Sequence, residues 1–368
     1  MAGPVGLEMA GQVLRRPLRL PYHPLYRFYE GGSLSRAFRG MEPGSDDWWS
    51  EDWVGSTTLA SNADPEGRPQ GYSAVSTGGS GDLLLTELLA ADPVGLVGAA
   101  FAERWPGTTG VLVKLLSPAG QVPLHAHPSR AWAREHLHSP FGKTEAWIIL
   151  DTPDASRETA YAGIGFREGI DRRAFGEAVR RHDRAAVRDT LHRTDIRPGD
   201  VYVAHAGVPH YLGPRISFIE VQEPTDHIVI AETDGTDDYG ATMGLGWDEA
   251  LDMIDYSAAD RESTLGRARQ TPSVVRGSGG NREVRLFGPE LDEFFGASRL
   301  EVAGELAVDD GRFYVGIVVA GGGTIEGEFG AEPIRRGETF ACAASLGHRL
   351  RAGTAPLAVV RCMGPLVQ

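Results

Sequence analysis

Four side chains with metal-ligating chemistry lie in three short segments of this sequence. His125 and His127 are two residues apart, and on a β-strand that spacing points both imidazoles to the same face. Glu145 begins an apolar run, and His210 ends a turn-rich segment. Three imidazoles and one carboxylate suit a divalent transition metal with an open coordination position. A metal in such a site acts as a Lewis acid on a bound oxygen.

Two alternatives compete with this metal site. A metal-free buried network would be hard to satisfy with three neutral imidazoles and one carboxylate. His136 and His138 also have the two-residue spacing, but they lie in a polar stretch that is typical of a loop, and a flexible loop is a poor metal scaffold. His205 is left open as a group that supports a metal ligand, a substrate contact or a surface residue. Three further histidines are expected to be solvated: His23, His182 and His192.

Length and composition limit the class of protein. The chain has 368 residues, which allows two to three domains, and its net charge of −14 argues against nucleic acid and anionic membranes as partners. Cys342 and Cys362 are too few for a disulfide framework and are expected to be buried free thiols. We find no secretory signal and no apolar run long enough to span a membrane, so a cytoplasmic location is expected.

Short apolar runs separated by Gly, Pro and Asp favour β-barrel or sandwich cores. The strands expected most clearly span residues 111–116, 145–150, 201–203, 216–221, 313–319, 323–327 and 356–362. Residues 171–193 have helical spacing and predict an amphipathic helix or helix pair that covers a barrel. Helices are also expected over 83–90 and 247–254, and a long, turn-rich loop over 62–82.

The chain contains a weak internal repeat. Gly199 to His210 reads G-x5-H-x-G-x2-H, and Gly337 to His348 reads G-x5-A-x-S-x2-H. The match suggests two copies of one barrel, the second without metal ligands. The expected organisation is a loosely ordered lead-in (1–21), a catalytic barrel (22–150 with 196–235), a helical insertion (151–195), a helical connector (236–271) and a second barrel (272–368).

The motifs resemble those of the type I phosphomannose isomerases, a branch of the cupin superfamily. The likeness is strong over residues 22–230 and limited to architecture over 270–368. It implies a mainly β double cupin with helical insertions, jelly-roll barrels and metal in the first barrel only. The segments that carry it are 26–32, 51–56, 113–116, 127–128, 142–147, 199–200, 206–210 and 220–226.

The resemblance implies a metal-dependent aldose–ketose isomerase that interconverts mannose 6-phosphate and fructose 6-phosphate through a cis-enediol. Zinc is the expected metal, with Mn, Fe, Co and Ni as alternatives, and the partner is a small sugar or sugar phosphate. Lys143 and Glu220 are the candidates for the general base. Lys143 could equally hold a substrate oxygen or anion. Each residue could instead have a structural role, a salt bridge for the lysine and a paired carboxylate for the glutamate. Lys114, Trp53 and His205 are the expected substrate contacts.

Three positions depart from the family pattern. His125 replaces a glutamine, Pro123 replaces a serine, and Ile230 replaces an arginine. The metal ligands are kept, but a hydroxyl expected near a phosphate and an arginine expected at the active site are lost. Three alternatives therefore stay open: an isomerase or epimerase of an unphosphorylated sugar, a non-catalytic sugar-binding cupin, and a metal-dependent oxygenase.

Overall fold

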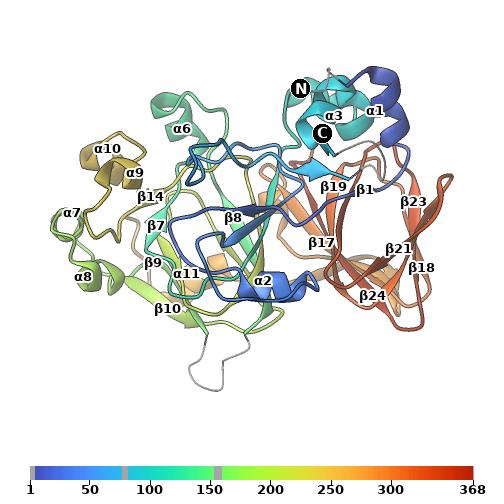
Figure 1. Cartoon of the computed structure of the whole chain (residues 1–368). Coiled ribbons are helices and arrows are strands. Elements are labelled where there is room, and N and C mark those ends of the chain that lie inside the picture. Colours follow the sequence, from blue (N-terminus) through green and yellow to red (C-terminus); the bar gives the residue numbers. More distant parts are fainter. Residues whose placement is uncertain (1–4, 77–81, 153–159, 368) are drawn as a thin grey trace.

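The structure is a computed structural model that describes residues 5–76, 82–152 and 160–367 (Figure 1). Antiparallel strands dominate it, which confirms the mainly β class expected from the short apolar runs. The two cysteines are buried and unpaired, as predicted. Among the described helices none is long and apolar enough to cross a membrane.

The first pair of sheets forms the left half of Figure 1. The six-stranded sheet has the order β11 (Val201–Ala204), β8 (Glu145–Asp151), β13 (Ser217–Gln222), β6 (Leu112–Leu116), β3 (Glu51–Val54) and β2 (Pro24–Leu25). The five-stranded sheet has the order β10 (Leu191–Asp195), β9 (Tyr161–Phe166), β12 (His210–Leu212), β7 (His125–Ala126) and β14 (Val229–Ile230). Trp147 and Phe218 of the first sheet share one buried core with Ile164 and Leu212 of the second.

The second pair of sheets forms the orange and red half of Figure 1. The seven-stranded sheet has the order β1 (Leu18–Arg19), β22 (Thr339–Cys342), β19 (Tyr314–Ala320), β24 (Leu357–Met363), β17 (Gly296–Val302), β16 (Asn281–Arg285) and β15 (Ser273–Ser278). The four-stranded sheet has the order β18 (Glu305–Val308), β23 (His348–Ala352), β20 (Gly322–Gly327) and β21 (Gly330–Arg335). Phe340 and Val359 pack against Ile325 and Leu350 between these two sheets.

The six- and seven-stranded sheets pack back to back. One continuous cluster of buried side chains contains Val113 and Ile219 from the first sheet and Val315 and Val360 from the other. This arrangement explains why β6 is buried along its whole length, because both of its faces lie against a core. The strands near the metal ligands are therefore held from two sides.

Helices cover the open face of the five-stranded sheet. α7 (Arg172–Arg180), α8 (Arg184–Arg188) and α10 (Trp247–Asp252) contribute apolar side chains to a core with that sheet. The remaining helices are α1 (Leu7–Val13), α2 (Ser33–Phe38), α3 (Leu85–Ala91), α4 (Pro93–Val97), α5 (Ala99–Arg104), α6 (Arg130–His136), α9 (Asp238–Ala241), α11 (Arg261–Ala268) and the 3-10 turn Pro289–Leu291. A separate two-stranded sheet pairs β4 (Ala74–Val75) with β5 (Leu83–Leu84).

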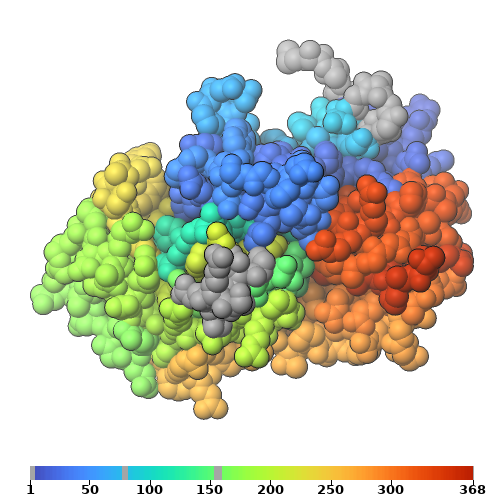
Figure 2. Space-filling view, turned by 60° about the horizontal axis from the view of Figure 1, so that its bottom comes forward, coloured from blue at the N-terminus to red at the C-terminus, as the bar shows by residue number. Residues whose placement is uncertain are grey.

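Three segments differ from expectation. Residues 151–195 are not only helical, because β9 and β10 flank the helix pair and belong to the five-stranded sheet. The lead-in is ordered over its described part, because Leu18 of β1 pairs with Ala341 and is buried. Figure 2 shows the segment that follows the lead-in, in lighter blue, lying over the junction of the green and red halves of the molecule. The 62–82 loop contains β4, and its residues 77–81 lie outside the described residues.

The internal repeat of the sequence has a structural counterpart. Gly199 and Gly337 both have φ near +90°, at +87° and +89°, which favours glycine. Ala204 and Cys342 each follow their glycine by the same number of residues along the chain. In the first pair of sheets Glu145 lies opposite Ala204, and in the second pair Tyr314 lies opposite Cys342. Tyr314 therefore occupies the position that Glu145 has in the first pair.

Candidate metal centre

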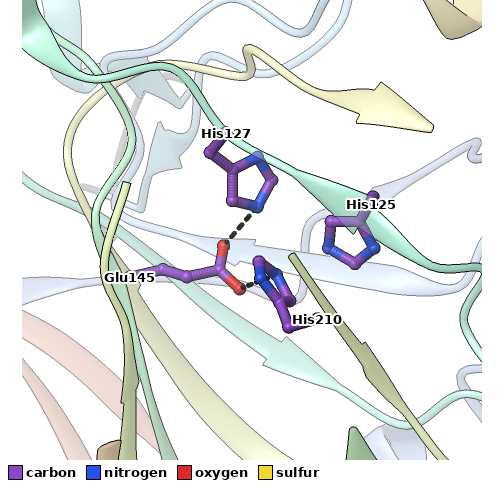
Figure 3. A group of neighbouring side chains, drawn as sticks. All are labelled: His125, His127, Glu145 and His210. Atoms are coloured by element: carbon purple, nitrogen blue, oxygen red, sulfur yellow. Dashed lines mark ion pairs between the residues drawn. The ribbon is translucent and has the colours of Figure 1, made fainter. Parts of the chain in front are cut away.

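The predicted ligand set comes together in the first pair of sheets. His125, His127, Glu145 and His210 are buried, and one ligand atom of each lies within 4.8 Å of the others. Neighbouring strands of the five-stranded sheet place His125 directly opposite His210, while Glu145 begins β8 in the facing sheet. Figure 3 shows His127 and His210 directed at the carboxylate, with His125 beside His210.

Backbone carbonyls determine the tautomer of all three histidines. The Nδ1 contacts are His125 to Pro123 O at 2.7 Å, His127 to His227 O at 2.8 Å, and His210 to Val208 O at 2.9 Å. A carbonyl oxygen only accepts, so each Nδ1 carries the proton and donates it. Each Nε2 is then left with a free lone pair, which is the arrangement that metal-ligating histidines show.

The free nitrogens face the carboxylate rather than a donor. His127 Nε2 lies 3.0 Å from Glu145 Oε2, and His210 Nε2 lies 3.2 Å from Glu145 Oε1. Three of these atoms, His127 Nε2, His210 Nε2 and Glu145 Oε2, are buried and have no hydrogen-bond partner among the described residues. Burial, followed by the charge of Lys143, lowers the pKa of His127 to about 3, so the ring is neutral at pH 7. Acceptors that face one another in this way fit a cation between them.

The Glu145 carboxylate is held in its ionised form. Burial raises its pKa, but the charge of Lys143 and the contacts with His127 outweigh burial and leave the pKa well below the usual range. Lys143 Nζ lies 3.3 Å from Oε2, and the indole of Trp147, two residues along the same strand, donates to Oε1 at 2.9 Å. The carboxylate is therefore oriented by its own strand.

A buried charge network adjoins the ligand set. Lys114 Nζ lies 3.0 Å from Glu220 Oε1 and 3.4 Å from Glu51 Oε2. Arg27 forms two hydrogen bonds of 2.9 Å with Asp226 and an ion pair of 3.2 Å with Glu51. Burial lowers the pKa of Lys114, but the Glu220 and Glu51 charges outweigh it and raise the pKa above the usual value. Lys114 therefore stays protonated and positively charged within the network.

The other predicted site residues divide into two groups. Lys114, Lys143 and Glu220 lie beside the ligand set. Trp53 is fully buried and supports the network, because its indole donates to Glu51 and its ring lies 5.1 Å from Lys114 Nζ. Trp53 therefore lies in the buried network beside Lys114, and its contact with a substrate stays a prediction.

His205 lies in a different place from the one we expected for a substrate contact. It lines a separate cavity of about 200 Å³ together with Asp255 and Arg267, and no member of the ligand set lines that cavity. The short spacing to His210 misled the prediction, because the turn between the two histidines changes the direction of the chain.

Other histidines also differ from expectation. His136 ends helix α6 rather than lying in a loop, and its ring stacks on Trp132 at 4.3 Å, away from the ligand set. His192 is buried on β10 and bonds to the carbonyl of Ala259, and His23 is half-buried beside Ser73. These rings have structural partners instead of solvent.

Sequence reasoning missed three charged residues of this region, Arg27, Glu51 and Asp226. All three are buried, and their pairing joins segments that are far apart along the chain. The signal was present, because each lies in a segment that carried the resemblance, but no single segment shows its partner.

Comparison with known proteins gives relatives in both sequence and fold. GmuF of Bacillus subtilis, named a probable mannose-6-phosphate isomerase, is 25% identical over 58% of this chain and 63% of its own length, so the chain spans less than two thirds of that relative. YvyI of the same organism, named a putative mannose-6-phosphate isomerase, is 26% identical over 79% of this chain and 85% of its own length. No protein-family model matches the sequence.

Two solved structures share the architecture. The mannose 6-phosphate isomerase of Bacillus subtilis has a TM-score of 0.71 at 22% identity, over 94% of this chain and 99% of its own. A variant of the phosphomannose isomerase of Salmonella typhimurium has a TM-score of 0.71 at 14% identity, over 95% of this chain and all of its own. Sequence and fold together confirm the predicted resemblance of this chain to the type I phosphomannose isomerases.

Proposed function

We propose that the protein is a metal-dependent aldose–ketose isomerase of the phosphomannose isomerase type, built on two cupin barrels with the metal in the first. His125, His127, Glu145 and His210 would hold one divalent ion, with zinc as the first candidate and Mn, Fe, Co or Ni as alternatives. The observation that carries the proposal is the set of unprotonated Nε2 atoms directed at an ionised carboxylate. The names of the relatives support a mannose-type aldose and a fructose-type ketose.

The reaction moves a proton between C2 and C1 through a cis-enediol. When bound, the metal supplies a Lewis acid that polarises the sugar oxygens at these carbons. Glu220 is the first candidate for the base, because burial and the nearby Glu145 charge raise its pKa above the usual value. Lys114, at 3.0 Å, keeps the Glu220 carboxylate in place. Lys143 is the second candidate for the base, and its alternative role is to donate a hydrogen bond to a substrate oxygen.

Isomerisation in heavy water tests the proposal. The metal-loaded protein is incubated with D-mannose and with D-mannose 6-phosphate, and the products are followed by NMR. We expect a ketose with deuterium at C1, formed only when metal is present. Binding of a sugar without conversion or exchange would instead support the non-catalytic cupin. Absence of both conversion and exchange with every aldose offered would refute the isomerase.

Metal analysis separates the isomerase from an oxygenase. An oxygenase needs a redox-active metal, whereas the proton transfer above needs only a Lewis acid. We therefore expect protein loaded with zinc alone to convert the sugar under nitrogen. A requirement for oxygen would contradict the proposal.

A further inference from the structure

The strand register places an apolar side chain beside the ligand set. His210 lies opposite His125 on one side and Ile164 on the other, and His125 lies opposite Ile230. Residues directly opposite one another on antiparallel strands point to the same face of the sheet. Ile230 therefore shares the face of His125 and His210. Ile164 is buried, whereas Ile230 is partly exposed, so Ile230 is the isoleucine that a bound molecule can reach.

The basic side chains beside the ligand set already have partners. The chain contains only two lysines, and both are here: Lys143 contacts Glu145, and Lys114 lies between Glu51 and Glu220. Arg27, the third cation, is at most 4% exposed and is held by Asp226 and Glu51.

The charges of this region are close to balance. Three cations face four carboxylates, and a divalent metal then leaves an excess of one positive charge. An enediolate that forms during isomerisation carries one negative charge, and the excess positive charge would stabilise it. A phosphate dianion would need further cations, and turning Arg27 toward it would leave the buried Asp226 carboxylate unpaired. The Ile230 side chain also offers a phosphate no hydrogen-bond donor.

We propose that the substrate of this site is an unphosphorylated aldose, with Ile230 in contact with the sugar. The inference rests on the proposed isomerase function and narrows its substrate class. The sugar hydroxyls would bind the charged network, and the Ile230 side chain would lie against sugar carbons.

Two measurements on the metal-loaded full chain test the inference. The first compares kcat/KM for D-mannose and D-mannose 6-phosphate, and the second compares by calorimetry the binding of mannitol and mannitol 6-phosphate, which cannot be isomerised. We expect the neutral compound to be preferred by about tenfold or more in both. Equal or tighter binding of the phosphorylated alditol would overturn the inference, even if the isomerase activity is found. Failure to convert either sugar, with mannitol still preferred, would refute the isomerase and leave the ligand class standing.

A substitution provides the matched test. Ile230→Arg adds a cation on the ligand face, and we expect it to shift the preference toward the phosphorylated compound by about tenfold or more. Val275→Arg makes the same kind of change on an exposed position of the edge strand β15, in the other pair of sheets, and should leave the preference unchanged. An unchanged preference in Ile230→Arg, with the variant folded and metal-loaded, would show that Ile230 does not contact the substrate.

Discussion

Removal of one imidazole should weaken metal binding by an amount that the site geometry allows us to estimate. Four-ligand zinc sites bind with about 10–16 kcal/mol, so one ligand of four corresponds to about 3 kcal/mol. That is about two orders of magnitude in the dissociation constant. His127 has a free Nε2 directed at Glu145 and is 1% exposed, so solvent water cannot easily replace it. We therefore expect His127→Ala to bind zinc about a hundredfold more weakly.

Competition with a chromophoric zinc chelator measures this change directly. His136→Ala and His138→Ala are the matched controls, because they remove the other two-residue histidine pair, which lies outside the ligand set. We expect both controls to bind zinc as the unaltered protein does. Circular dichroism of each metal-free variant shows whether the fold is kept. The ligand assignment is wrong if His127→Ala keeps its affinity within about threefold, or if a control loses metal.

Three further outcomes are expected. Glu220→Gln should keep its metal and lose most of its turnover, since the amide cannot accept the C2 proton, and loss of metal instead would show a structural role. Arg27→Ala should lower the free energy of unfolding by about 3–5 kcal/mol in urea titrations, because Asp226 is left buried and unpaired. The control is Arg68→Ala, which removes an exposed ion pair and should leave the free energy of unfolding unchanged. Metal-free protein should lose stability as pH falls from about 6.5 toward 3, because the unfolded chain takes up protons that the buried His127 resists; a flat urea midpoint over that range would contradict this.

The metal ligands could be predicted because their signal is local. Two histidines two residues apart in an extended segment point to the same face, and Glu145 is marked by the apolar run that follows it. The charge network could not be predicted in the same way. Lys114 meets Glu220 and Glu51 only because β6 lies between β13 and β3, and this strand order is a property of the sheet rather than of any segment.

Two of the strands that the sequence did not predict, β9 and β10, have weak local patterns for physical reasons. β9 contains Gly163 and Gly165, which dilute its apolar pattern, and β10 alternates buried and exposed residues that include charged ones. The helices between them are strongly amphipathic, so the helical pattern dominated the prediction for that stretch. His192 is buried because it follows the alternation of β10, which becomes visible only once β10 is known to be a strand.

The contrast between His210 and His348 shows what makes one of the two equivalent positions a metal site. Both rings donate Nδ1–H to the carbonyl two residues earlier, so both present an unprotonated Nε2 to the interior. His210 meets the Glu145 carboxylate, which can only accept, whereas His348 meets the Tyr314 hydroxyl, which donates to it at 2.6 Å. Burial raises the pKa of Tyr314 well above its usual value, so the hydroxyl keeps its proton. The second ring is therefore satisfied without a cation, and metal analysis should find one ion per chain.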